Sequence, residues 1–417
     1  MRAGSGVLLL SGDSFMGLAI LRSLGRGGVR VVAAQAHPDG IGRFSRYCAE
    51  SVAMPRSGPR LAEDVLLLCR RHGVSHVIAT SEELIIALNE QRSRMEPEVR
   101  LLFPPADVMD IALHKNRTLH VAEAAGVPVP RTVHPRGMQD LERCAALGFP
   151  LVMKPAHRDP RLGIDRVLDF KVLYVQDADE LRRRLEAFAV IGEFPLVQEY
   201  CEGRGVGIEA LCRDGEPLLL FQHKRVHELP PDGGVSVVCE SVPVDHELAL
   251  HATRLLRAMR WDGVAMVEFR RDDPSGRTVL MEVNGRFWGS LPLAVHAGAD
   301  FPHLLYRAFS GDGPLPEARG YDVGVRCRDL IGDTRRLLSI LRTGDRPRAR
   351  AVLDYLRGFA FSTRWYGWVD DDPLPALMGF VVRPARALGI LRHAPVPGET
   401  LDPAPSAPVV RRGGAHA

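Results

Sequence analysis

The first 105 or so residues alternate strand-like and helix-like segments, and this alternation constrains the fold more than any other feature of the chain. The buried-strand pattern VLLLSG leads into the helical run GLAILRSLGRGG and then the strand VRVVAAQ. The helix LAEDVLLLCRRHG, the strand VSHVIAT and the helix SEELIIALNEQRS continue the order. Such alternation predicts an open parallel sheet with helices on both faces.

The turn SGDSFMG follows the first predicted strand, at a position where ligands often bind in folds of this kind. It lacks the GxGxxG spacing of a dinucleotide site. A structural turn is the favoured interpretation, and a dinucleotide site is the alternative.

Composition indicates an ordinary globular protein. The 417 residues predict two or three domains, and a net charge of +3 gives no reason to expect a nucleic-acid or membrane partner. The seven cysteines include no CxxC pair, which favours reduced thiols over a disulfide framework. The N-terminal VLLL is short for a signal peptide, Asp13 interrupts it, and no apolar run is long enough to span a membrane. We therefore expect a cytoplasmic protein.

The middle of the chain reads as α+β. Residues 106–126 have helical periodicity, with Asp107 as the expected N-cap and Gly126 as the expected C-cap. Further helices are expected at about 177–190, 245–260 and 291–310. The strand candidates are PLVMK, RVLDFKVLYV, PLVQEYC, VGIEALC, PLLLFQHKRV, GVAMVEFRR and TVLMEVNGRF.

Beyond about residue 315 the chain reads as helical and rich in arginine. The stretches YLRGFAFSTRWYGW and FVVRPARALGIL mix basic and apolar residues. Buried packing is the favoured role for them, with a dimer interface or a membrane surface as alternatives. The final residues are rich in Pro, Ala and Gly and are expected to be disordered.

The stretch LMEVNGRFWGSL places Glu282, Asn284 and Arg286 on alternate positions of a predicted strand. Alternate strand residues share one face, which is usually a solvated face. Glu268, in the preceding strand AMVEFRR, is joined to this strand by the hairpin-like connection DDPSGR. Two carboxylates and an amide oxygen suit Mg²⁺, and Arg286 suits a phosphoryl or carboxylate oxygen.

Lysine is rare in this chain, which contains four lysines among 54 lysine and arginine residues. Lysine supplies a compact, movable point charge, so a rare lysine indicates where such a charge is needed. Lys154 ends the strand PLVMKP, and Lys224 and Arg225 add positive charge in FQHKRV. Lys171, on an alternating strand, is interpreted as a plain surface residue.

Four motifs occur in order along the chain, namely HKNRTLHVAEAAGVPVPRT, FPLVMKP, VQEYCEG, and VEF followed by MEVNGRFWGSLPLAVHAGAD. Through these motifs, residues 1–312 resemble the ATP-grasp superfamily of carboxylate-amine ligases. The resemblance implies a mixed α/β and α+β chain with an ATP-grasp fold. Its parts are a Rossmann-like domain (1–106), a small lid subdomain (107–198), a larger metal-binding subdomain (199–312), a helical C-terminal extension (313–394) and a disordered tail (395–417).

The resemblance also implies a role for each matching residue. It implies ATP and Mg²⁺ as cofactors, with two metal ions expected and Mn²⁺ as an alternative. ATP-contacting residues would be Lys115, Lys154, Glu199, Tyr200, Cys201 and Glu202, with His223 as a candidate for the ribose. Metal ligands would be Glu268, Glu282 and Asn284, and Arg286, Lys224 and Arg225 would contact phosphate or substrate.

Three departures from the family pattern stand out. His114 precedes the first lysine where Asp is common, and Gly285 replaces the usual proline between Asn284 and Arg286. The loop after Lys154 has one glycine where many members have a glycine-rich flap over the phosphates. Arginines in that loop are the expected substitutes: Arg158, Arg161 and Arg166.

The implied reaction activates a substrate carboxylate as an acyl phosphate, with ADP as the co-product, for attack by an amine. That is an ADP-forming carbon–nitrogen ligase acting on small molecules, with a homodimer as one expected assembly. A carboxyphosphate-forming enzyme that uses bicarbonate and a non-catalytic ATP-binding module are the alternatives. Glu209 is open between the nucleotide site and a lid or surface position, and Ser290 has no nucleophile-elbow context.

Overall fold

The computed structural model describes residues 4–387 except for 38, 56, 157–169, 171, 232–233, 312–319, 345–346 and 361. The expected disordered tail, the loop arginines Arg158, Arg161 and Arg166, and Lys171 all lie outside the described residues. Within the described part, no helix combines the length and apolar character needed to cross a membrane.

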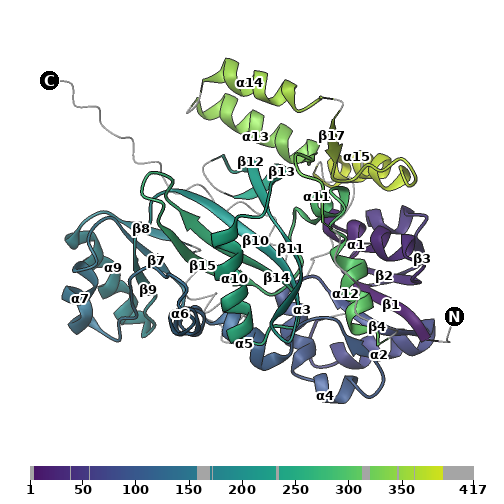
Figure 1. Cartoon of the computed structure of the whole chain (residues 1–417), viewed down its shortest axis with the longest axis horizontal. Coiled ribbons are helices and arrows are strands. Elements are labelled where there is room, and N and C mark those ends of the chain that lie inside the picture. Colours follow the sequence, from purple (N-terminus) through teal and green to yellow (C-terminus); the bar gives the residue numbers. More distant parts are fainter. Residues whose placement is uncertain are drawn as a thin grey trace.

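The N-terminal part is the predicted open parallel sheet with helices on both faces (Figure 1). Its strand order is β3-β2-β1-β4-β5, so the order reverses between β1 and β4. Every residue of β2 is buried, whereas β3, which the sequence pattern missed, is a largely exposed edge strand. The strands are β1 (Gly4–Leu10), β2 (Val31–Gln35), β3 (Cys48–Ala53), β4 (Val74–Ala79) and β5 (Arg100–Leu101); the helices are α1 (Phe15–Arg26), η1 (Ile41–Phe44), α2 (Leu61–His72), α3 (Glu82–Asn89) and α4 (Arg92–Met95).

The turn SGDSFMG joins β1 to α1 and is held by its own side chains. Ser14 caps the helix by accepting a hydrogen bond from the backbone N–H of Gly17 at 3.0 Å. Asp13 accepts the backbone N–H of Ala36 at 2.6 Å. A Cβ at Gly17 would lie 2.4 Å from the carbonyl oxygen of Ser11, so glycine is needed where helix and strand meet.

Two predicted helices are each split in the structure. The segment 106–126 breaks at His114, whose extended backbone (φ −96°, ψ 100°) separates two helices. Pro105 rather than Asp107 is the N-cap, and Asp107 lies in the first turn, where its charge favours the helix dipole. Gly126 follows the second helix in the left-handed conformation. The two helices are α5 (Ala106–Leu113) and α6 (Lys115–Ala124). The predicted helix 291–310 is likewise split into α11 (Leu291–His296) and α12 (Phe301–Phe309), and Gly298, in the left-handed conformation, lies between them.

A small four-stranded sheet with order β6-β9-β7-β8 has its own buried cluster, which includes Leu151, Leu185 and Val197. The predicted long strand RVLDFKVLYV contributes only Leu173–Val175 to the described structure. The elements are β6 (Thr132–Val133), η2 (Met138–Asp140), α7 (Leu141–Ala145), β7 (Leu151–Lys154), β8 (Leu173–Val175), α9 (Ala178–Ile191) and β9 (Leu196–Glu199).

The central antiparallel sheet has order β11-β10-β14-β15 and supplies the hairpin predicted from the sequence. The predicted strand PLLLFQHKRV is wrong as one element, because the chain breaks at Gln222, whose side-chain oxygen accepts the backbone N–H of Asp245 at 2.7 Å. Its two halves belong to different sheets. The elements are β10 (Arg204–Arg213), β11 (Glu216–Phe221), α10 (His246–Ala258), β14 (Gly263–Arg271) and β15 (Thr278–Asn284).

The C-terminal extension is not wholly helical, because it adds two short strands to a further sheet of order β12-β13-β16-β17. Residues 326–328 pair with β13, and 363–365 pair with them in parallel. Figure 1 shows this part lying across the top of the central sheet and reaching α1. The elements are β12 (His223–Leu229), β13 (Val235–Ser241), β16 (Arg326–Arg328), α13 (Leu330–Thr343), α14 (Arg348–Arg357), β17 (Thr363–Trp365) and α15 (Leu374–Ala387).

Candidate active site

The two acidic residues of the β14–β15 hairpin lie directly opposite each other. Glu268 and Glu282 are cross-strand partners, and Asn284 is the partner of Met266 two positions along. The Asn284 amide donates to an oxygen of Glu268 at 3.2 Å and to one of Glu282 at 3.4 Å. Asn284 is buried and the two glutamates are partly buried, so this is not a solvated strand face.

Cations approach the acidic hairpin from three elements. Arg225 on β12 places Nη2 3.0 Å from Glu268 and Nη1 3.3 Å from Glu228. Burial opposes the charge of Arg225, but these two carboxylates outweigh it and raise its pKa. Lys154, at the end of β7, places Nζ 3.8 Å from the sulfur of Met281. Lys115, the first residue of α6, lines a small cavity of about 10 Å³ together with Glu282.

The N-terminal part contributes one acid that the sequence analysis missed. Glu82 begins α3, directly after the carboxyl end of β4, and lines the same small cavity as Lys115 and Glu282. Its carboxylate lies 3.6 Å from Nε of Arg286, whose Nη1 donates to the carbonyl of Phe287 at 3.0 Å. The available signal was the N-cap motif SEEL after a buried strand, since polar residues at strand ends of parallel sheets often face a site.

The predicted adenine-binding segment lies at the end of β9. Glu199 is buried and receives ion pairs from Arg131, at 2.8 Å, and from Arg277. Burial alone would raise the pKa of Glu199, but the hydrogen bonds from these arginines reverse the effect and lower it. The Glu199 carboxylate is therefore engaged in fixing the segment.

The neighbours of Glu199 differ in exposure. Cys201 is buried, and burial raises the pKa of its thiol. Tyr200 lies under the guanidinium of Arg270, whose carbon is 5.7 Å from the ring centre. Glu202 is exposed.

The remaining two predicted site residues pair with residues other than Glu268 and Glu282. Lys224 is half exposed and places Nζ 2.7 Å from Glu240 on β13. His223 is buried, 2.8 Å from Glu209 and 3.2 Å from the hydroxyl of Ser290. The structure thus brings together Glu268, Glu282, Asn284, Arg225, Lys154, Lys115 and Arg286 around one hairpin.

The donor set of this hairpin suits a hard cation. Among the described residues no group of three or more His, Cys, Asp or Glu side chains is arranged to hold a metal ion. The hairpin offers two carboxylates and one amide, which fits Mg²⁺ because that ion keeps several oxygen ligands from water and phosphate. The Asn284 amide and Arg225 now donate to the oxygens that would face such an ion.

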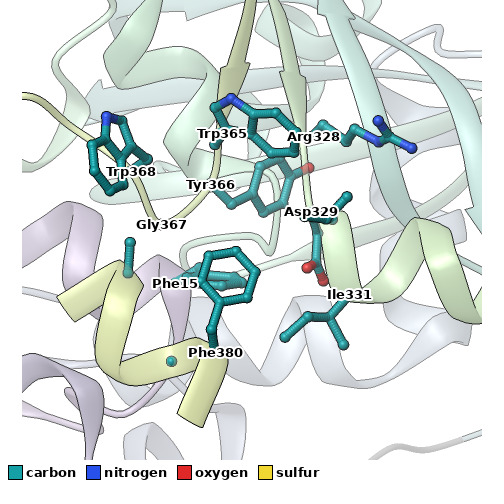
Figure 2. A pocket seen from close by; sticks show the side chains of 12 residues that line it. Phe15, Arg328, Asp329, Ile331, Trp365, Tyr366, Gly367, Trp368 and Phe380 are labelled. Carbon is teal, nitrogen blue, oxygen red and sulfur yellow. The ribbon is translucent and has the colours of Figure 1, made fainter. Parts of the chain in front are cut away.

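A second, apolar cavity of about 340 Å³ lies where the C-terminal extension meets the N-terminal part. Figure 2 shows aromatic side chains from α1, from the end of β17 and the segment after it, and from α15 around this cavity. None of the hairpin residues lines it. The aromatic lining residues are Phe15, Trp365, Tyr366, Trp368 and Phe380.

Comparisons with known proteins agree with this architecture. Residues 193–328 match the family described as "ATP-grasp in the biosynthetic pathway with Ter operon". A D-alanine–D-alanine ligase of Marinobacter nauticus is 30% identical over 213 residues, which cover 47% of this chain and 62% of that protein. The chain therefore spans less than two thirds of that relative's length.

Solved structures show the same fold at low sequence identity. A biotin carboxylase from Campylobacter jejuni aligns with a TM-score of 0.61 and 16% identity, over 77% of this chain and 74% of that one. An L-amino acid ligase from Bacillus licheniformis aligns with a TM-score of 0.54 and 17% identity, over 73% and 74%. The central hairpin lies inside the segment that matches the family.

Proposed function

The chain belongs to the ATP-grasp superfamily, and from this premise we propose that it is an ATP-dependent ligase that joins a carboxylic acid to an amine. The observation that carries the proposal is the direct pairing of Glu268 and Glu282, bridged by the Asn284 amide. Two partly buried carboxylates side by side repel each other and are costly without cations. Such a cluster is expected where a protein binds Mg²⁺ with a phosphorylated ligand.

The proposed roles of the other residues follow from their positions. Glu268, Glu282 and Asn284 would hold Mg²⁺, which would neutralise charge on the transferred phosphoryl group. Lys115 and Lys154 approach the hairpin from α6 and β7 and would contact the phosphates of ATP. The backbone of residues 199–202 would bind adenine. Arg286 and Arg225 would steady the phosphoryl group and the carboxylate.

The proposed chemistry has two steps. The carboxylate attacks the γ-phosphorus of ATP, which gives an acyl phosphate and ADP. The amine then attacks the acyl carbon, and phosphate leaves as the amide forms. A carboxylate is otherwise a poor electrophile because its leaving group would be oxide, so the protein's task is alignment and charge neutralisation.

Amide formation is favoured over the two alternatives. The curated relative is named a D-alanine–D-alanine ligase, whereas the biotin carboxylase shares only the fold at 16% identity. A bicarbonate-activating enzyme is therefore the second candidate. A non-catalytic ATP-binding module is disfavoured, because nucleotide binding alone does not require the paired carboxylates and Arg286 together.

The domain boundaries remain part of the proposal. The lid would be residues 107–198 with the sheet β6-β9-β7-β8, and the metal-binding part would be residues 199–312. The substrates would be a small carboxylic acid and a small amine, and a homodimer is the proposed assembly.

The experiment is phosphate release from ATP and Mg²⁺ in the presence of pooled amino acids and small carboxylic acids. Glu282→Ala is the test variant, and Asp273→Ala is its matched control, because Asp273 lies on the same hairpin in an exposed pair with Arg204. We expect release that depends on one pool, with ADP as co-product, and loss only in Glu282→Ala. AMP as the co-product, or full activity in Glu282→Ala, would contradict the proposal.

A further inference from the structure

A serine, a histidine and a glutamate lie in line beside the acidic hairpin. His223, the first residue of β12, places Nε2 3.2 Å from the hydroxyl oxygen of Ser290 and Nδ1 2.8 Å from Oε1 of Glu209. Glu209 is fully buried, and the exposed fractions of His223 and Ser290 are 6% and 7%. The three residues come from separate elements, namely β10, β12 and the start of α11, so the fold and not a local turn brings them together.

The register of the central sheet places this group next to the proposed reaction centre. Glu209 on β10 is the partner of Met266 on β14, which is the partner of Asn284 on β15. Cross-strand partners point to the same face, so Glu209 lies on the face that carries Glu268 and Glu282. Ser290 follows Arg286 by four residues. The three side chains therefore extend the site away from the paired carboxylates.

The burial of Glu209 is costly and calls for an explanation. Among the described residues neither of its oxygens accepts a hydrogen bond, because the Nδ1 of His223 lies at ion-pair distance but outside hydrogen-bond angles. A buried carboxylate without such partners is destabilising, so a role in the chemistry of the site would account for its position.

In the part of the chain that the structure describes, the other groups around Glu209 do not balance its charge. Tyr321 stacks edge-on against Phe221 and donates to the carbonyl of Val242, and burial raises its pKa. Burial also raises the pKa of the Cys239 thiol, to about 12, so both groups stay neutral. The next cations along β12, Lys224 and Arg225, pair with Glu240 and Glu268. Among the described residues, His223 is the basic side chain that lies beside Glu209, with Nδ1 2.8 Å from Oε1.

We propose that Ser290, His223 and Glu209 form a proton relay for the amine, an inference that rests on the proposed function. As the amine nitrogen bonds to the acyl carbon, the bond from that carbon to the phosphate oxygen breaks and phosphate leaves. The surplus proton of the nitrogen passes to the Ser290 hydroxyl, whose own proton passes to Nε2 of His223. Glu209 balances the imidazolium so formed, and the proton returns to solvent with product release. Ser290 is the catalytic residue, and His223 and Glu209 act through it.

The relay predicts a split between two acceptors. An amine is mostly protonated near neutral pH and needs a base, whereas hydroxylamine is mostly unprotonated and attacks an acyl phosphate without one. In His223→Asn we expect amide formation to fall by about 10²- to 10⁴-fold, while hydroxamate formation and the KM for ATP stay near the parent values. His246→Asn, at an exposed helix position, is the matched control and should change neither product.

Each outcome decides between explanations. Loss of both products in His223→Asn would overturn the relay in favour of a role in ATP binding, such as the ribose contact considered from the sequence. Retention of both would also overturn it. Hydroxamate formation itself reports that the variant is folded. If the parent protein makes neither product from any acid, the proposed function fails, and the relay fails with it. Where the parent makes both products, Glu282→Ala should lose both, whereas His223→Asn should lose only the amide.

A second variant separates proton transfer from packing. Glu209→Gln keeps the volume of the side chain but removes the charge that would balance the imidazolium. We expect it to lower the kcat for amide formation with little change in the KM for the amine, and to leave hydroxamate formation intact. A rise in the KM for the amine with no fall in the kcat for amide formation would assign Glu209 to substrate binding and contradict the relay.

Discussion

Arg22 and Asp372 stand 350 residues apart in the sequence and form one buried ion pair, with Nε 2.9 Å from Oδ2. Arg22 also donates to the carbonyls of Gly367 and Asp372, and the Asp372 carboxylate accepts the Ser45 hydroxyl at 2.6 Å. The pair fixes the segment before α15 onto α1. Burial lowers the pKa of Arg22, against the opposing effect of Asp372.

Removal of one partner of this pair should be strongly destabilising. Asp372→Ala leaves the Arg22 guanidinium buried without its counter-ion, and we expect the free energy of unfolding to fall by about 3–5 kcal/mol. Asp273→Ala breaks the exposed pair with Arg204 and should cost about 1 kcal/mol or less. Urea unfolding of both variants measures the difference, and equal losses would contradict it.

Two glycines that line the apolar cavity should respond to alanine in opposite directions. Gly379 lies inside α15, and a Cβ there would have Ile41 as its nearest neighbour at 3.8 Å, so Gly379→Ala should stabilise by about 0.5–1 kcal/mol. A Cβ at Gly367 would lie 2.7 Å from the ring of Phe15, so Gly367→Ala should destabilise by about 1–3 kcal/mol. Thermal unfolding compares the two, and a shift of the same sign would refute the packing described.

His296 should make the protein less stable as pH falls. Burial lowers its pKa to about 4, although the carbonyl of Trp365, 3.2 Å from Nε2, opposes the shift. Between pH 6.5 and 4 the unfolded chain binds a proton here that the folded chain does not, so the penalty grows as pH falls and is absent above about 6.5. It reaches about 3 kcal/mol.

The contribution of His296 is isolated by comparison with His296→Leu. The difference in unfolding free energy between about pH 7.5 and pH 4.5 should be smaller in this variant by most of that amount. Carboxylates such as Asp245, whose pKa is lowered to about 2 by its hydrogen bond from Arg271, titrate equally in both proteins and cancel. Identical pH slopes would show that the partly buried position of His296 does not disfavour its charged form.

Arg225 should compete with Mg²⁺ for Glu268. It holds that carboxylate at 3.0 Å, and a charge-assisted hydrogen bond of this kind contributes about 1.5–3 kcal/mol. Arg225→Met should therefore strengthen Mg²⁺ binding about tenfold or more while lowering the rate of phosphate release. Isothermal titration with Mg²⁺ alone measures the first effect. Weaker Mg²⁺ binding in this variant would mean that Arg225 organises the site rather than competing for it.

The sequence predicted those elements whose pattern of apolar, polar and turn residues is encoded in adjacent positions. The hairpin of Glu268 and Glu282 was predicted because strand alternation and a Pro-Gly connection are encoded in adjacent residues, and Lys154 was placed correctly at a strand end. The leading parallel sheet was predicted for the same reason. The breaks at His114, Gln222 and Gly298 were missed, because helical or strand periodicity continues across each of them.

Long-range pairings had no comparable signal. The three-residue strands at 326–328 and 363–365 exist because β13 offers them a partner, so their own residues carry little pattern. The ion pair of Arg22 with Asp372 and the contact of His223 with Glu209 join residues that no local periodicity relates. The sequence did not decide whether Glu209 lies at the nucleotide site or at the surface. Strand alternation predicts which face of the sheet the side chain is on, but not which elements cover that face.

The ion pairs of Glu199 join the small sheet to the central sheet. Glu199 ends β9 of the small sheet, and Arg277 lies in the connection between β14 and β15 of the central sheet. The small sheet has its own core, whereas the N-terminal part and the C-terminal extension are pinned together through Arg22. The backbone proposed to bind adenine would therefore be held between the two sheets, by Arg131 on one side and Arg277 on the other. Replacement of either arginine would loosen the grip of the protein on the base and leave the residues proposed to contact the phosphates in place.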